Sequence, residues 1–234
     1  AEKYGAPIEA VNIPVVYVDF ETPEQYARDL DILGKIFGNP KRAEELIAYY
    51  QGKQTAVTVA LAAESTHPSV LLLQYALKDG AVAFTVPPLS WMQTRLVEMA
   101  CGTVAWSDVQ PSSGWTTVTI EQIAAWDPDV ILIVAYNDDP SAIAASLKED
   151  AQWKTLRAVQ NGKLYGFPKD LYSWDQPDTR WVLGLQWLAT VLYPERLKPE
   201  TLMPAVQEFY QFAYGLDAQA FEASIKPALQ GDLP

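Results

Sequence analysis

Residues 119–136 of this chain read TIEQIAAWDPDVILIVAY in one-letter code, and this stretch decides the fold class. The first part, 119–126, has the spacing of apolar residues that predicts a helix. Asp127-Pro128-Asp129 then ends the helix and leads into a strand, because Asp and Pro favour turns. Residues 130–136 are almost wholly apolar, which is typical of a buried strand in a parallel sheet.

Strands and helices alternate on both sides of this stretch. We predict strands at 69–76, 81–86, 103–106 and 163–167. We predict helices at 90–101, 141–149, 179–192, 204–214 and 218–225. Such alternation indicates an α/β fold, a Rossmann-like lobe whose largely parallel sheet has helices on both faces.

The first 66 residues have a different pattern. Residues 14–20, Pro-Val-Val-Tyr-Val-Asp-Phe, predict a buried strand that no earlier strand could pair with. Thr22, Pro23 and Gln25 predict the start of a helix that runs to Gly38. A second helical stretch covers residues 41–64 and would reach ~35 Å at ~1.5 Å per residue. A helix of this length is typical of a connection between domains.

Composition limits the partners and the chemistry. The chain has 17 basic and 29 acidic residues, so its net charge of −12 opposes binding to nucleic acid. An anionic small ligand is still compatible, because local arginines can dominate a pocket. Cys101 is the one cysteine, which excludes a disulfide framework. No apolar run is long enough to span a membrane, and we expect any targeting segment to lie outside this chain.

Few residues could support catalysis. His67 is the only histidine and lies in a Thr-His-Pro turn, where an exposed loop residue is the simpler interpretation. The sequence has no Gly-rich phosphate loop, no nucleophile elbow and no metal-ligand spacing. Carboxylates that could pair for hydrolysis are Asp127, Asp129, Asp138, Asp139, Asp175 and Asp178. Turns and helix caps are the stronger explanation for the first four. We therefore expect no enzyme, no catalytic residue, no metal ligand and no cofactor.

Aromatic residues follow four of the predicted strands, where ligands bind in open α/β sheets. They are Tyr75, Trp91, Tyr136, Tyr172 and Trp174. Arg95 and Arg180 lie in the first turns of the helices that follow, and a helix N-terminus favours anions. Each arginine could instead be a salt-bridged surface residue, and each tryptophan could belong to the core. Together they predict a ligand-binding face.

Residues 172–189, YSWDQPDTRWVLGLQWLA, resemble the aromatic, Pro, Arg and Gly-Leu-x-x-Leu-Ala pattern near the end of class III substrate-binding proteins of ABC importers. Residues 119–132 are similar to that family's recurring helix, Pro-Asp and strand segment. Tyr193-Pro194 and Glu208-Phe209-Tyr210, with Tyr214, look like the tail of its iron and molybdate-type branch. The resemblance extends over nearly the whole chain.

The resemblance implies two α/β lobes joined by one long helix, with the ligand between the lobes. Residues 1–38 would then be a remnant of the amino-terminal lobe (a strand and a helix), 39–66 the connecting helix, and 67–234 the carboxy-terminal ligand-binding lobe. A chain of this kind would be a fragment, and its orphan strand at 14–20 predicts some tendency to dimerise.

The resemblance also implies residue roles. Trp174 and Arg180 fall where the family lines its cleft, and Trp91, Arg95, Tyr136 and Tyr172 are carried over from neighbouring loops. Glu121 matches the carboxylate that the family offers to its permease, although an acidic residue there also stabilises the helix dipole.

The function implied is capture of a metal chelate, first of all an iron siderophore, and its delivery to an ABC permease. The protein would act in the periplasm or outside the cell, with or without a lipid anchor. Molybdate, tungstate, cobalamin or haem would suit the same fold. A nitrogenase-like cofactor scaffold and a domain that has lost its ligand are further alternatives, but a single cysteine argues against the scaffold.

Overall fold

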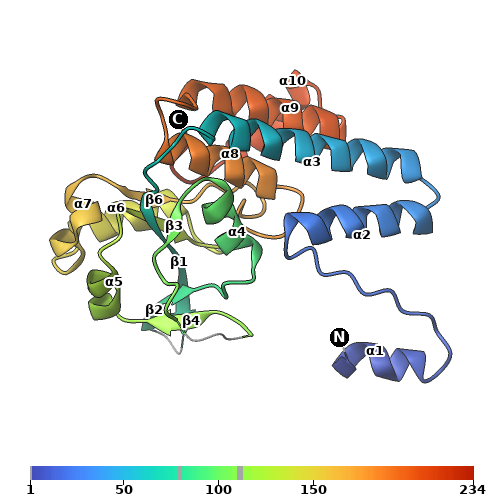
Figure 1. Ribbon diagram of the computed structural model, residues 1–234, viewed down its shortest axis with the longest axis horizontal. Coiled ribbons are helices and arrows are strands. Elements are labelled where there is room, and N and C mark those ends of the chain that lie inside the picture. The colour runs from blue at the N-terminus through green and yellow to red at the C-terminus, as the bar shows by residue number, and fades with distance from the viewer. Residues whose placement is uncertain (1, 79–80, 110–112) are drawn as a thin grey trace.

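The computed structural model describes residues 2–78, 81–109 and 113–234 (Figure 1). The strands within these ranges are β1 (Ser69–Lys78), β2 (Ala81–Val86), β3 (Thr103–Val104), β4 (Thr116–Val118), β5 (Val130–Val134) and β6 (Leu164–Gly166). They form one sheet in the order β4-β2-β1-β5-β6, with β3 paired to the start of β1. β1 is parallel to β3 and β5, and β5 is parallel to β6. The predicted α/β class is therefore confirmed.

One part of the sheet departs from the parallel arrangement. β2 is antiparallel to both β1 and β4, so the sheet is mixed at this side. Short β4 was not predicted, since three residues leave too little pattern to recognise.

Helices cover the sheet and pack against one another. They are α1 (Glu2–Glu9), α2 (Pro23–Ile36), α3 (Pro40–Leu61), α4 (Met92–Met99), α5 (Ile120–Trp126), α6 (Pro140–Glu149), α7 (Arg157–Gln160), α8 (Trp181–Leu192), α9 (Leu202–Tyr214) and α10 (Ala218–Ala220). α8 packs against α3, α4 and α9, whereas α6 and α7 lie beside β5 and β6 (Figure 1). A π-helical turn, Phe221–Ile225, completes the helix predicted at 218–225. No helix in the described ranges is long and apolar enough to cross a membrane.

The core lies around the central strands. All five residues of β5 are buried, as the apolar run predicts. Leu72 of β1 pairs with Leu132 of β5 at the middle of the parallel register, and both are fully buried. Burying such a side chain contributes roughly 1.5–3 kcal/mol. Phe167 and Trp187 extend the core beyond β6 through an edge-to-face contact at 4.7 Å.

Local capping explains where several helices begin. The side chains that accept a hydrogen bond from the first turn of α2, α3, α5 and α6 are Thr22, Asn39, Thr119 and Asp139. At α5 the Thr119 hydroxyl accepts from the Gln122 amide, and the Gln122 side chain accepts from the Thr119 amide. This reciprocal pair is a capping box, which satisfies two N–H groups that the helix leaves free.

The long helix predicted at 41–64 is α3, which is 22 residues long. One side of α3 faces α2, and a Cβ at Gly34 of α2 would lie 2.5 Å from the Cβ of Ala43 in α3. The absence of a side chain at Gly34 is therefore what lets the two helices approach closely. The role of α3 as a connection between lobes stays a prediction.

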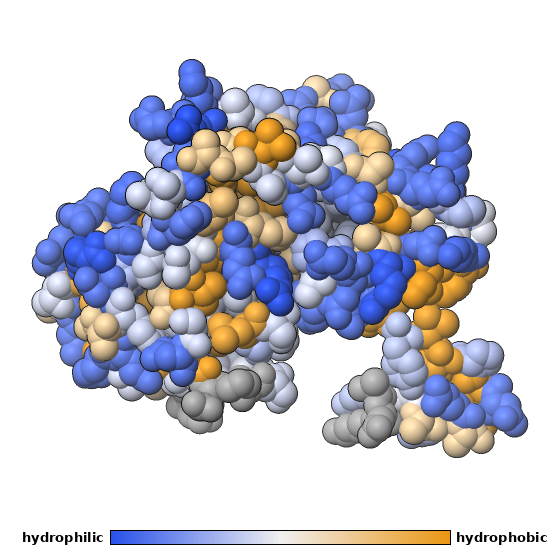
Figure 2. All heavy atoms as spheres, viewed as in Figure 1, coloured by the Kyte–Doolittle hydropathy of each residue, from blue (hydrophilic) through white to orange (hydrophobic). Residues whose placement is uncertain are grey.

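The prediction of a strand at residues 14–20 is wrong. These residues form no ladder with any part of the described chain, and Val16 and Tyr17 are 54% and 47% exposed. A strand needs a partner for its N–H and C=O groups, and apolar pattern alone does not provide one. The segment is instead fixed at its end, where buried Asp29 accepts hydrogen bonds from the amides of Asp19 (2.9 Å) and Phe20 (3.2 Å). With unpredicted α1 it stands away from the rest of the protein and carries apolar side chains (Figures 1 and 2).

Candidate functional site

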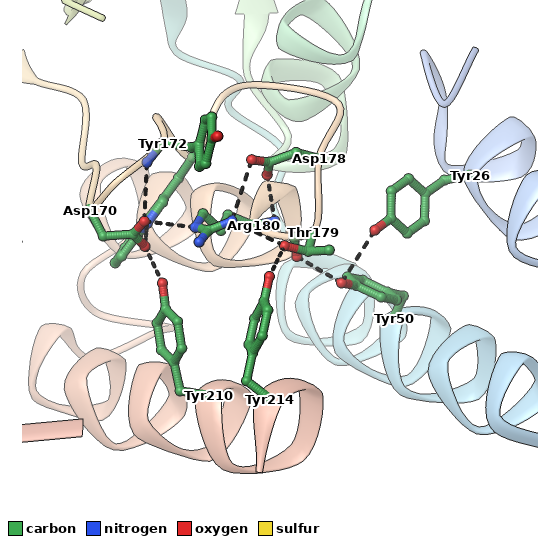
Figure 3. Close-up of polar contacts among 10 residues, drawn as sticks. Tyr26, Tyr50, Asp170, Tyr172, Asp178, Thr179, Arg180, Tyr210 and Tyr214 are labelled. Atoms are coloured by element: carbon green, nitrogen blue, oxygen red, sulfur yellow. Dashed lines mark hydrogen bonds and ion pairs between the residues drawn. The ribbon is translucent and has the colours of Figure 1, made fainter. Parts of the chain in front are cut away.

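The loop between β6 and α8 forms a network of polar contacts around Asp170 (Figure 3). The Asp170 carboxylate has no exposed surface and accepts hydrogen bonds from Arg180 Nε (2.7 Å), the Trp174 indole N–H (2.9 Å) and the Tyr210 hydroxyl. It also accepts from the Tyr172 amide at 3.2 Å. A carboxylate can be buried when donors satisfy both of its oxygens. Asp170 is therefore the centre that holds the loop to α9.

Arg180 lies at the N-terminal end of α8 and is ion-paired rather than free. Its side chain is 9% exposed, and its guanidinium lies 2.7 Å from Asp170 and 3.5 Å from Asp178. The guanidinium also lies over the rings of Tyr172 and Tyr214, with its central carbon 5.3 and 5.8 Å from the two ring centres. Two carboxylates thus share one positive charge.

This arrangement shifts two pKa values. Burial alone would lower the pKa of Arg180, but Asp170, Tyr210, Asp178 and Tyr214 together raise it further than burial lowers it, so Arg180 stays protonated. Burial raises the pKa of Asp178 to about 6, although its bond from the Arg180 amide and the nearby guanidinium oppose this rise. Asp178 can therefore change charge near neutral pH.

A second group of residues lies at the ends of β2 and β5. The rings of Trp91, Trp115 and Tyr136 form a row with edge-to-face contacts, Trp91 to Trp115 at 6.0 Å and Trp115 to Tyr136 at 6.3 Å. All three residues are half-buried, so each keeps part of its surface open. Aromatic rings of this kind provide rigid contact area for a ligand.

The aromatic row rests on a buried carboxylate. Asp175 is fully buried, and one of its oxygens accepts from the Tyr136 hydroxyl (3.0 Å) and the Gln93 side-chain amide (3.1 Å). Burial raises the pKa of Asp175, because no cation among the described residues contacts it to offset the loss of water. Tyr136 is thereby held at a fixed angle beside Trp115.

The structure thus divides the residues that the sequence proposed for the ligand face. Arg180 and Tyr172 come together around Asp170, while Trp91 and Tyr136 meet in the aromatic row. Arg95 pairs with Glu98 at 2.7 Å, which is the salt-bridged alternative that the sequence left open.

Trp174 and Glu121 take different positions. Trp174 is fully buried, so it belongs to the core and contributes its indole N–H to Asp170. Glu121 is exposed in the first turn of α5, which lies apart from α8 and α9 (Figure 1). A hydrogen bond from the Thr119 side chain lowers the pKa of Glu121 and keeps it ionised.

Several residues of these groups were not proposed from the sequence as ligand-face residues. They are Asp170, Gln93, Trp115, Asp178, Tyr210 and Tyr214. Tyr210 and Tyr214 had a usable signal, since two tyrosines four residues apart lie on one face of a helix. Asp170 had none, because its partners Arg180 and Tyr210 lie ten and forty residues away in sequence. In the described ranges no group of three or more His, Cys, Asp or Glu could hold a metal ion.

Comparisons with known proteins place this chain in a family. The family model described as "Periplasmic binding protein" matches residues 8–171. The molybdate-binding protein MolA of Haemophilus influenzae is 29% identical over 102 residues, which are 43% of this chain and 28% of that protein. The Fe(3+)-citrate-binding protein YfmC of Bacillus subtilis is 31% identical over 65 residues, which are 28% of this chain and 20% of that protein.

A solved structure supports the same assignment. The periplasmic solute binding protein from Veillonella parvula superposes with a TM-score of 0.73 at 26% identity, over 95% of this chain and 67% of that one. The aligned segments of the two curated relatives are much shorter, less than a third of their lengths. Because the family model covers most of the chain, from the segment before α2 to the loop that holds Asp170, the chain belongs to the periplasmic binding protein family.

Proposed function

We propose that this chain is the connecting helix and ligand-binding lobe of a solute-binding protein that serves an ABC importer. It captures a metal chelate and delivers it to a permease without performing chemistry. The observation that carries the proposal is the pair of aromatic groups at the carboxyl ends of β5 and β6, one around Arg180 and one formed by Trp91, Trp115 and Tyr136. Ligands of open α/β sheets bind at this end of the strands.

The charge around Arg180 favours a chelate over a bare oxyanion. Its positive charge is already shared by Asp170 and Asp178, and Arg95 is paired with Glu98. A small oxyanion is bound most strongly by donors that carry positive charge not already shared with carboxylates. A larger chelate can instead use exposed apolar surface, and Leu171 and Tyr172 are 68% and 58% exposed. A ferric siderophore is therefore the first ligand that we propose.

Tryptophan fluorescence can test this ligand class. The protein is titrated with a ferric catecholate siderophore, ferric citrate, haem, cobalamin and molybdate. We expect a ferric chelate at roughly micromolar concentration to quench the emission of Trp91 and Trp115. Trp91→Phe should lose part of the quenching, whereas Trp126→Phe, which changes an indole bonded to Asp108 outside the aromatic row, should not. A response to molybdate alone would refute the proposal that the ligand is a metal chelate.

Molybdate or tungstate is the second candidate. It is favoured by one observation, that the relative 29% identical over 102 residues is a molybdate-binding protein. The same titration distinguishes the two ligands, because they are added separately to one protein.

We also propose that exposed Glu121 contacts a basic pocket of the permease, on the side of the membrane away from the cytoplasm. Glu121→Gln should reduce stimulation of the transporter's ATPase in proteoliposomes and leave ligand affinity unchanged. Glu44→Gln is the control, since Glu44 is also exposed, on α3. Equal stimulation by both variants would exclude this contact. A lipid anchor would place the protein at the same surface.

Dimerisation through the exposed segment at 14–18 belongs to the same proposal. Unpaired apolar backbone tends to pair with another chain. Light scattering checks it, and a monomer at about 100 μM would exclude dimerisation.

A further inference from the structure

Thr179, the residue before Arg180, is held by two helices (Figure 3). Its carbonyl oxygen accepts a hydrogen bond of 2.7 Å from the Tyr50 hydroxyl of α3. Its hydroxyl is hydrogen-bonded to the Tyr214 hydroxyl of α9 at 2.5 Å and accepts from Arg180 Nη1 at 3.2 Å. The guanidinium of Arg180 is therefore connected through Thr179 to both α3 and α9.

Tyr50 is rigidly placed. It is 4% exposed, and its ring stacks on Trp181 with the ring centres 5.5 Å apart. Tyr26 of α2 contacts the ring edge-on, with the ring centres 5.0 Å apart, and donates a 3.4 Å hydrogen bond to the Tyr50 hydroxyl. Burial raises the pKa of Tyr50, so its hydroxyl stays protonated and remains a donor. Tyr50 thus contacts the residues on both sides of Arg180 in the chain.

We propose that Tyr50 is a positioning residue for Arg180, acting through Thr179. The proposal rests on the proposed function in one step only, that Arg180 belongs to the ligand site. Within the loop, the Arg180 amide is fixed by Asp178 at 2.7 Å. Tyr50 supplies the anchor from outside the loop. Without it the peptide between Thr179 and Arg180 keeps only the anchor at the Arg180 amide, and the 2.7 Å contact of Arg180 Nε with Asp170 is held less firmly.

The decisive test observes Arg180 directly and needs no ligand. Tyr50→Phe removes one hydroxyl and keeps the ring on Trp181. The readouts are the NMR signals of Arg180 Nε–H and of the Trp174 indole N–H, because both groups donate to Asp170. We expect both signals to shift in Tyr50→Phe.

The matched control is Tyr193→Phe. Tyr193 is also a buried tyrosine whose hydroxyl donates to backbone carbonyls, those of Thr66 (2.9 Å) and Cys101 (2.8 Å). The control should lose a similar amount of stability and leave the two signals in place. Unchanged signals in Tyr50→Phe, or equal shifts in the control, would overturn the proposal.

A second variant tests the connection through Thr179. Thr179→Val keeps the carbonyl that Tyr50 binds and removes the hydroxyl that Arg180 Nη1 and Tyr214 contact. Its Arg180 signal should shift as in Tyr50→Phe. An Arg180 signal that stays unshifted would show that the Thr179 hydroxyl does not hold Arg180 and would overturn the connection from Tyr50 through Thr179 to the guanidinium. This variant keeps the proposal testable if Tyr50→Phe fails to fold.

Ligand affinity is measured last, with ferric citrate as the probe. Loss of one anchoring hydrogen bond should weaken binding about five-fold in Tyr50→Phe and not in Tyr193→Phe. If the probe binds both variants with the affinity of the unmodified protein, Tyr50 has no role in the ligand site. If the probe binds none of the three proteins while the NMR signals shift as expected, the proposed ligand fails and the positioning of Arg180 stands.

Discussion

Replacing Asp170 with Asn is expected to destabilise the protein strongly. The amide keeps the shape of the carboxylate but removes its charge and turns one oxygen into a donor. Arg180 then loses its 2.7 Å partner while only 9% exposed, or a buried donor of Trp174 or Tyr210 faces the new NH₂ group. Breaking a buried ion pair from one side costs about 3–5 kcal/mol. For a chain of 234 residues this corresponds to a fall in Tm of roughly 10 °C.

Removing the positive partner, Arg180, should lower the free energy of unfolding by less. Arg180→Met leaves Asp170 with three hydrogen-bond donors, from Trp174, Tyr210 and the amide of Tyr172. We expect a loss of about 2 kcal/mol, because the remaining carboxylate is still hydrogen-bonded. The double variant removes both charges, so its loss should be smaller than the sum of the single losses by about 2 kcal/mol.

Urea unfolding followed by circular dichroism measures all three free energies. Asp31→Asn is the control, since Asp31 pairs with Lys35 at 2.6 Å but is 48% exposed, and such surface pairs contribute about 0–1 kcal/mol. A loss below about 1 kcal/mol for Asp170→Asn, or strictly additive losses in the double variant, would refute the view that Asp170 and Arg180 act as one buried pair.

Three further predictions concern stability. Asp178→Asn should raise the Tm at pH 7.5 but not at pH 5. The pKa of Asp178 in the folded state is about 6 and exceeds the usual 3.8, so the native state loses stability as pH rises through 6, by at most about 3 kcal/mol. Calorimetry measures both Tm values, and an equal Tm difference at the two pH values would contradict this. Gly184→Ala should prevent normal folding, because a Cβ there would lie 2.3 Å from the carbonyl oxygen of Trp174, and a native-like near-ultraviolet spectrum would be the opposite result. Thr119→Ala should cost about 1 kcal/mol in urea unfolding through loss of the α5 cap, and a stability equal to the parent would show that the cap is dispensable.

The sequence predicts best what local contacts determine. Thr22 caps α2 through the amide of Gln25, three residues later, so a short pattern contains the whole interaction. Val130–Val134 is buried because every residue in it is apolar. Residues 14–20 have a similar pattern, apolar except for Asp19, yet no partner edge within the described ranges pairs with them. Strand formation depends on a second segment, and the pattern of one segment cannot supply that information.

The candidate site shows the same limit. The arginine at position 180 and its aromatic neighbours were recognisable, because they follow a strand and begin a helix. The ion pairing of Arg180 was not recognisable, since Asp170 reaches it across a folded loop and Tyr210 approaches Asp170 from α9. Of the two interpretations that the sequence left open for Arg95, the structure shows the salt bridge.

The pH dependence of binding should distinguish a neutral chelate from an oxyanion. At pH 7.5 the three charged groups Asp170, Asp178 and Arg180 carry a net charge of −1, and below the Asp178 pKa of about 6 they carry none. One unit charge at ~6 Å changes the binding free energy of an anion by about 1.4–3 kcal/mol at an effective dielectric constant of about 20–40. An oxyanion should therefore bind roughly ten-fold more tightly at pH 5.5 than at pH 7.5, and Asp178→Asn should abolish the difference. A chelate without net charge should show no such change, so a ferric complex of zero charge that followed the same pH profile would argue against a site that selects by shape and aromatic contact.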